Sequence, residues 1–383
     1  MTRKLYDENA YIKEFEATVI DSYKGADGYF TILDRTAFFP EGGGQPSDIG
    51  FLNDIKVYDV QINEGIIYHY TEKQFQKDEK VTGVIDFDRR FDFMQHHSGE
   101  HIVSGVAHNL LGCENVGFHL SETITTLDFD KMLSPTEVLT LQREANRKIY
   151  KNARINAYYP DSETLKTLEY RSKKELHGDI RIVEIEDTDI CACCAPHVKN
   201  AGEIGFISLK ILEKVRGGVR LELKCGMRAL KDIEEKDRNI SEISSALCVK
   251  PTDCSIGVER LIKQIAELKF KNNELKRQIT ENKVLSFNPS KNVTAEFEEN
   301  MDIKELQHYA DALFKKAGGI RGVFSLTDSG YFFAFCGEAQ KTDEFFKGFR
   351  EKFEVRGGGR NGMVQGTVFA SKEDLLKYIN IFQ

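Results

Sequence analysis

The segment MQHHSGEH, residues 94–101, and the segment CCAPH, residues 193–197, place the strongest constraint on the fold of this chain. Each segment carries two good zinc ligands four residues apart, and these are His97 with His101 and Cys193 with His197. Residues i and i+4 share one face of a helix, so the two histidines of the first segment can point at one ion. The second pair would complete a tetrahedral His/Cys set. Since the two pairs lie far apart in the sequence, the tertiary fold must assemble them.

A helical period surrounds the first pair and predicts a helix over residues 91–112. Glu100 lies on or beside the same face as the histidines, where a carboxylate suits a general base toward a metal-bound water or a group that orients a histidine. Each half has a plainer interpretation, a solvated helix face or a small buried thiol. Both halves together, in a chain with only nine His and eight Cys, favour a metal site.

Composition limits the class of protein. A length of 383 residues with 40% hydrophobic content predicts two or three domains with real cores. No run approaches the ~20 apolar residues of a membrane span, and the polar start predicts no signal peptide. Cysteines crowd at 191, 193 and 194, which is unlike a disulfide framework and predicts a cytoplasmic protein. The net charge of −8 argues against indiscriminate nucleic-acid coating but allows a local basic patch.

The pattern of elements predicts an α+β multidomain protein of four parts. Short β-branched and aromatic runs between turn residues predict a β-barrel-like domain over residues 1–90. Residues 91–228 read as an α+β unit that contains both ligand pairs, closed by a hairpin turned at Arg216. Residues 229–286 read as a helical connector, and residues 293–383 as a small α/β domain.

The connector carries a 4,3 repeat of apolar residues between Cys254 and Asn282, with Asn272 at an inner position. Such a repeat is typical of a coiled-coil seam, in which a buried Asn fixes the register. Two copies of the chain could form a homodimer through residues 254–282. The alternative is an antiparallel hairpin with a weaker helix at residues 230–248.

Glycine-rich stretches supply further candidates. The three glycines before Gln45 allow the backbone to approach a ligand closely, although a hairpin turn explains them equally well. The stretches RGGVR (216–220) and RGGGR (356–360) combine a flexible backbone with cations that suit an RNA backbone. The RNA-contacting candidates are Arg216, Arg220, Arg356 and Arg360. A glycine-rich turn with solvated arginines is the alternative.

Four motifs in order resemble the long form of AlaX proteins, the free-standing relatives of the alanyl-tRNA synthetase editing domain. They are LDRTAFFPEGGGQPSDIG (33–50), MQHHSGEH (94–101), CCAPHVKNAGEIG (193–205) and GGGRNGMVQG (357–366). The last resembles the signature of the domain shared by alanyl-tRNA synthetases and DHH-type phosphoesterases. The family commonly has Cys-Gly-Gly-Thr-His where this chain has CCAPH. Cys193 keeps the spacing to His197, and Cys191 and Cys194 are additional thiols.

The resemblance implies a zinc-dependent hydrolase that removes serine, or glycine, wrongly attached to tRNA for alanine. Selection of serine over alanine needs polar groups for the hydroxyl, and Gln45 and His119 are the pocket candidates. A closed four-ligand site would instead be structural, in a tRNA-binding module. The spacing His-x-x-Glu-His also matches an inverted zinc-peptidase motif, but such enzymes usually take a further ligand from a downstream Glu, and here the Cys–His pair competes for that place.

Overall fold

The computed structural model describes residues 2–25, 28–172, 180–289 and 291–382. The chain divides into two compact units, Met1–Glu242 and Ile243–Gln383, and each is described by itself. The predicted α+β multidomain class is confirmed. The boundary between the units falls within helix α5 (Gly226–Leu247), and the finer division into four parts stays a prediction.

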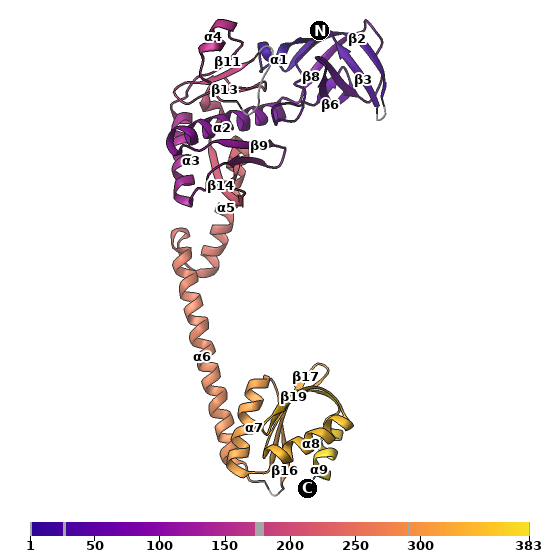
Figure 1. The fold of residues 1–383 in the computed structure, drawn as a ribbon, viewed down its shortest axis with the longest axis vertical. Coiled ribbons are helices and arrows are strands. Elements are labelled where there is room, and N and C mark those ends of the chain that lie inside the picture. Colours follow the sequence, from indigo (N-terminus) through magenta and orange to yellow (C-terminus); the bar gives the residue numbers. More distant parts are fainter. Residues whose placement is uncertain (1, 26–27, 173–179, 290, 383) are drawn as a thin grey trace. The chain divides into compact units, whose positions relative to one another are not determined.

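Six strands of the first unit pair in a ring and form a closed barrel (Figure 1). In their order around the ring they are β2 (Glu14–Gly25), β3 (Gly28–Leu33), β7 (Ile66–Thr71), β6 (Ile55–Asn63), β5 (Gly50–Leu52) and β8 (Lys80–Ile85). The last strand returns to the first, with Glu14 opposite Val84. Alternating apolar residues fill the interior, as the period of two requires, and Val19, Leu33 and Ile67 are fully buried. Strand β1 (Arg3–Lys4) and helix α1 (Leu5–Glu8) precede the barrel strands in the chain. Strand β1 pairs with β4 (Arg35–Thr36).

Helix α2 (Phe87–Leu111) follows the barrel and begins four residues earlier than predicted. The Asp86 side chain accepts a hydrogen bond from the Arg89 N–H at the start, and Gly112 ends the helix in the left-handed conformation with φ of 59°. The residues from Phe93 to Ala107 are all buried, so α2 is the central helix of the first unit. Both predicted histidine ligands therefore project from a rigid, enclosed element.

Two sheets and a second helix complete this unit. One sheet has the order β14 (Ile207–Val215), β15 (Gly218–Cys225), β10 (Thr125–Phe129), β9 (Asn115–Leu120), and the other β11 (Ile155–Tyr158), β12 (Ile182–Ile185), β13 (Asp189–Ala192). Helix α3 (Pro135–Tyr150) starts with a capping box formed by Ser134 and Glu137. Helix α4 (Ser162–Thr167) and a 3-10 turn (Ala201–Ile204) connect these elements. The predicted hairpin turns between β14 and β15, at Arg216 and Gly217.

The second unit contains α6 (Cys254–Ser286) and a five-stranded sheet. The predicted run of helix is interrupted by a 3-10 turn at Pro251–Asp253, which separates α5 from α6. The sheet order is β16 (Val293–Glu298), β17 (Ile320–Thr327), β18 (Gly330–Cys336), β20 (Met363–Phe369), β19 (Glu354–Arg360). Three further helices alternate with or follow these strands in the chain, and they are α7 (Ile303–Ala317), α8 (Ala339–Lys352) and α9 (Lys372–Ile381). The interpretation of residues 356–360 as a turn is wrong, because they form edge strand β19 and the chain turns at Asn361 and Gly362.

None of the helices in the described part of the chain combines the length and apolar character needed to cross a bilayer.

Candidate metal centre

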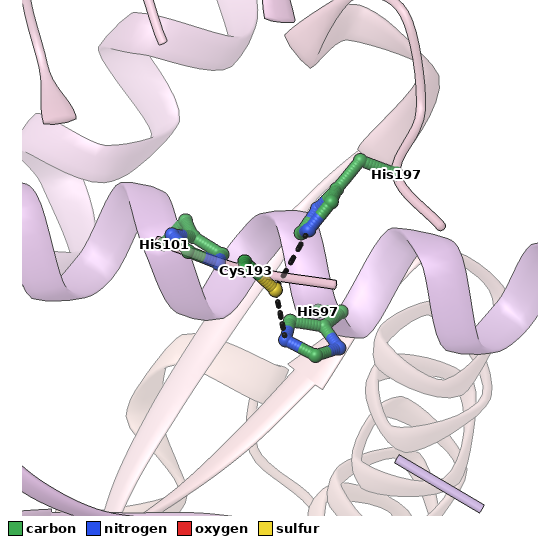
Figure 2. Close-up of side chains that lie close together, drawn as sticks. All are labelled: His97, His101, Cys193 and His197. Carbon is green, nitrogen blue, oxygen red and sulfur yellow. Dashed lines mark hydrogen bonds between the residues drawn. The ribbon is translucent and has the colours of Figure 1, made fainter. Parts of the chain in front are cut away.

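The four predicted ligands converge on one point in the first unit. One ligand atom from each of His97, His101, Cys193 and His197 lies within 4.8 Å of the others. The Cys193 Sγ is 3.4 Å from Nε2 of His97 and 3.4 Å from Nε2 of His197. Figure 2 shows the two α2 histidines and His197 arranged around the Cys193 sulfur. The i, i+4 spacing on α2 thus brings both histidines to the same cluster, as the sequence predicts.

The second ring nitrogen of each histidine has an oxygen partner. Nδ1 of His97 is 2.9 Å from Oε1 of Gln45, and Nδ1 of His197 is 3.1 Å from Oγ of Ser98. Nδ1 of His101 is 3.0 Å from Oδ2 of Asp189. An oxygen partner at Nδ1 favours the tautomer with the proton on Nδ1 and the lone pair on Nε2. In the neutral form of each imidazole, the lone pair on Nε2 is therefore available to a metal.

Asp189 is itself held by Arg171. The guanidinium donates from Nε to Oδ1 at 2.7 Å and from Nη2 to Oδ2 at 2.8 Å, a bidentate pair. Although burial opposes it, the hydrogen bonds from His101 and Arg171 keep the pKa of the Asp189 carboxyl below its ordinary value. Asp189 is thus an anion that orients His101, and neither it nor Arg171 was predicted from the sequence.

The cysteine ligand sits on a loop that Arg181 fixes. Its Nη1 donates to the carbonyl oxygens of Cys193 and Ala195, at 3.1 and 2.9 Å. Although burial opposes ionisation, the imidazoles of His97 and His197 hold the pKa of the Cys193 thiol well below its ordinary value. Burial lowers the pKa of His197 to about 3. Thiolate and neutral imidazole are the forms that bind metal ions.

The additional thiols occupy different places. Cys191 is buried and groups with His101 and Asp189, whereas Cys194 belongs to neither group of potential metal ligands in the described part of the chain. Cys194 is exposed, and its sulfur lies beside the glycine-rich turn. The choice of Cys193 as the ligand therefore agrees with the geometry.

The glycine-rich turn packs directly against this centre. Gly42 and Gln45 exchange two backbone hydrogen bonds, and Gly43 and Gly44 between them have φ of 61° and 81°. A Cβ on Gly43 would lie 3.8 Å from Cε1 of His97. The stretch is a tight turn that lies beside His97, and its approach to a bound ligand stays a prediction. Gln45 is fully buried, and its Nε2 has no hydrogen-bond partner among the described residues.

An ion pair connects the glycine-rich segment to α2. Asp48 accepts from the Phe39 N–H at 2.5 Å and is paired with the guanidinium of Arg90, and both side chains of the pair are buried. Arg90 also donates to the carbonyl oxygens of Ala10 and Ala37. Removal of one partner from such a pair leaves an uncompensated buried charge. The pair therefore fixes the turn relative to the histidines.

Glu100 is 2% exposed and lies beside the ligands. Its Oε1 accepts from Oγ of Ser104 at 2.8 Å and from Nδ2 of Asn115 at 2.6 Å. Its Oε2 is 3.8 Å from Nε2 of His101. Although burial opposes it, the charge of Glu100 and the hydrogen bond with Asp189 hold the pKa of His101 well above its ordinary value. The cluster therefore attracts positive charge, and its donor set of three imidazoles and a thiolate suits zinc.

A cavity of about 640 Å³ opens onto the centre. Its described lining includes the ligands His97, His101 and Cys193, the acid Glu100, the cations Lys4 and Arg181, the glycines Gly43 and Gly44, and the aromatic rings of Phe118 and Tyr159. A space of this size accommodates a small organic molecule or the end of a larger one.

The remaining predicted residues lie elsewhere. His119 is exposed on β9 and is not among the described residues that line the cavity, whereas its neighbour Phe118 is. Arg216 is exposed at the hairpin, whereas Arg220 is paired with Asp128 and Glu213. In the second unit Arg356 and Arg360 are exposed on β19, with Arg356 over the ring of Phe369.

Sequence comparison agrees with this architecture. Residues 5–89 match the family of class II (A) tRNA synthetases, and residues 180–221 match the second additional domain of threonyl and alanyl tRNA synthetases. The barrel and the segment that carries Cys193 and His197 are therefore the parts of the chain that are similar to tRNA synthetases.

Comparison with individual proteins shows similarity to alanine–tRNA ligases. The chain is 30% identical to the alanine–tRNA ligase of Pyrococcus abyssi, over 96% of this chain and 42% of that protein. It is 31% identical to the alanine–tRNA ligase of Archaeoglobus fulgidus, over 99% of this chain and 44% of that protein. It is 32% identical to the alanine–tRNA ligase of Ignicoccus hospitalis, over 73% of this chain and 31% of that protein. The chain thus spans less than half of the length of these ligases. Over most of its length, the chain is therefore similar to a part of these alanine–tRNA ligases.

Proposed function

We propose that this protein uses zinc to hydrolyse the ester of tRNA for alanine that wrongly carries serine, with glycine as the second candidate amino acid. The observation that carries the proposal is the convergence of His97, His101, Cys193 and His197 on one point beside a cavity. The domain match to threonyl and alanyl tRNA synthetases supports tRNA as the partner. Zinc bound by these residues supplies an activated water and a Lewis acid for the ester carbonyl.

The protein's own side chains orient the ligands and shape the space for the substrate. Gln45, Ser98 and Asp189 hold the three imidazoles by Nδ1. The Gly43–Gly44 turn leaves room at one wall of the cavity, where a Cβ on Gly44 would lie 2.9 Å from Cδ1 of Phe118. The unpartnered Nε2 of Gln45 is a buried donor next to His97, which supports a role in recognising a polar group of the substrate.

Contact with the tRNA backbone is proposed for the arginines. Arg216, Arg356 and Arg360 have exposed side chains suited to phosphate. Arg220 is bound bidentately to Asp128, at 2.7 and 2.8 Å, so its charge is largely compensated. We therefore expect Arg216 to contribute more to RNA affinity than Arg220.

The deciding experiment follows deacylation of tRNA for alanine charged with serine or with alanine by the purified, zinc-loaded protein. We expect serine to be released at least tenfold faster than alanine, because a site that binds a hydroxyl disfavours its absence. His97→Ala should abolish the activity, and His108→Ala is the matched control, since His108 is an exposed histidine of the same helix. Equal release of the two amino acids, or full activity of His97→Ala, would refute the proposal.

A second candidate is a tRNA-binding module with a structural zinc. The presence of four ligands within 4.8 Å of one another favours it, because closed four-ligand sites are typical of structural zinc. Chelation separates the candidates. Loss of the folded state on metal removal, without any deacylation by the loaded protein, supports the structural site. Loss of activity from a protein that stays folded supports the hydrolase.

A further inference from the structure

We propose that Glu100 is the anionic subsite for the α-ammonium group of the substrate, so that the protein acts on esters of amino acids whose α-amino group is free. This inference rests on the proposed function, because it places an aminoacyl ester at the metal centre. It adds that the substrate must carry a free α-amino group, whatever the side chain of its amino acid.

The position of the Glu100 carboxylate is fixed from one side. Ser104 Oγ and Asn115 Nδ2 both donate to Oε1, at 2.8 and 2.6 Å, and Asn115 Nδ2 is also 2.8 Å from Ser104 Oγ. All three side chains are at least 95% buried. Donors that converge on one carboxylate oxygen stabilise its negative charge and keep it in one rotamer. A carboxylate buried in this way is prepared to meet a cation.

The covalent structure of the substrate determines where its ammonium group can lie. In an aminoacyl ester the nitrogen is two bonds from the carbonyl carbon, a separation of about 2.5 Å. A carbonyl group at the His/Cys cluster therefore brings the ammonium group close to the side chains that border the cluster. Oε2 of Glu100 borders it, at 3.8 Å from Nε2 of His101.

Among the described residues that line the cavity, Glu100 is the single carboxylate. The other charged side chains of that lining, apart from the ligands, are Lys4 and Arg181, which repel an ammonium group. Asp189 is close to His101 but is engaged by Arg171 and does not belong to this lining. The electrostatics of the cavity thus offer the ammonium group one partner.

The test uses two hydrolysis-resistant adenosine derivatives in which an amide replaces the ester. One carries a seryl group at the 3′-amino position, and the other carries 3-hydroxypropanoyl, which keeps the hydroxyl and lacks the amine. Their dissociation constants for the zinc-loaded protein are measured by calorimetry at neutral pH. We expect the seryl derivative to bind at least about tenfold more tightly, since a hydrogen bond between charged groups is involved.

Variants test the assignment to Glu100. Glu100→Gln should remove the difference between the two derivatives, whereas Glu114→Gln, which changes a half-exposed glutamate after the same helix, should retain it. Equal binding of the derivatives to the unaltered protein overturns the inference, and so does an undiminished difference in a folded Glu100→Gln. If neither derivative binds, the proposed function fails as well. The comparison on the unaltered protein remains decisive even if Glu100→Gln does not fold.

Discussion

The three imidazoles of the metal centre are held by partners of different charge. Gln45 and Ser98 are neutral, whereas Asp189 is an anion paired with Arg171. A carboxylate on the second nitrogen raises the basicity of a metal-binding imidazole and fixes the plane of its ring. His101 is therefore expected to be the strongest nitrogen ligand of the set.

We predict that Asp189→Asn lowers zinc affinity about 10- to 100-fold while the fold is retained. The amide keeps the size of the side chain but removes its charge and weakens the pair with Arg171. Competition with a chromophoric chelator measures the affinity. Asp187→Asn, at an exposed position of the turn just before β13, is the control and should bind zinc normally. Unchanged affinity of the Asp189 variant would show that this carboxylate does not support the centre.

At the scale of elements, the glycine-rich turn and helix α2 form the site together. The turn requires two successive residues with positive φ, which glycine adopts without strain. Its second glycine also faces Phe118, since a Cβ there would lie 2.9 Å from Cδ1 and 3.2 Å from the carbonyl oxygen of that residue. The sequence of the turn is therefore constrained by both conformation and contact.

A pair of glycine substitutions separates these two constraints. Gly65 has φ of 79° in open space, so Gly65→Ala should cost only the conformational strain, roughly 1–2 kcal/mol. Gly44→Ala, with φ of 81°, should cost more, because the methyl group also displaces Phe118. Urea unfolding monitored at several wavelengths gives both free energies of unfolding. An equal loss in the two variants would contradict the importance of the contact.

At the scale of the whole molecule, helix α6 presents an apolar seam. The seam residues that are at least 42% exposed in the single chain are Val258, Leu261, Ile265, Leu268, Leu275 and Ile279. Exposed apolar residues at a 4,3 spacing are typical of a helix that meets a partner helix. Dimerisation through residues 254–282 stays a prediction.

We expect the full chain to sediment as a dimer and Ile265→Glu with Leu275→Glu to sediment as a monomer, because buried carboxylates would oppose each other across the seam. Phe270→Glu is the control, since Phe270 is 73% exposed and lies opposite the seam. Sedimentation velocity distinguishes the states. A monomeric unaltered chain, or a dimer that survives the double substitution, would contradict the prediction.

Much of the site could be predicted because its signals are local. The spacing of His97 and His101 needs only the geometry of a helix. The alternative interpretation of residues 356–360 as a turn was wrong, because a run of glycines signals a turn locally whereas pairing with β20 makes it a strand. The pocket role of His119 stays a prediction, and His119 is not among the described residues that line the cavity.

The sequence by itself determined the four candidate ligands, the helix that carries two of them and the α+β class, since each depends on residue spacing within one segment. Only the tertiary structure decided which groups support those ligands. Asp189 reaches His101 from β13, Arg171 reaches Asp189 from the chain before β12, and Asn115 reaches Glu100 from β9. Such partners have no local signal, because their proximity arises from the packing of distant segments around the buried helix α2.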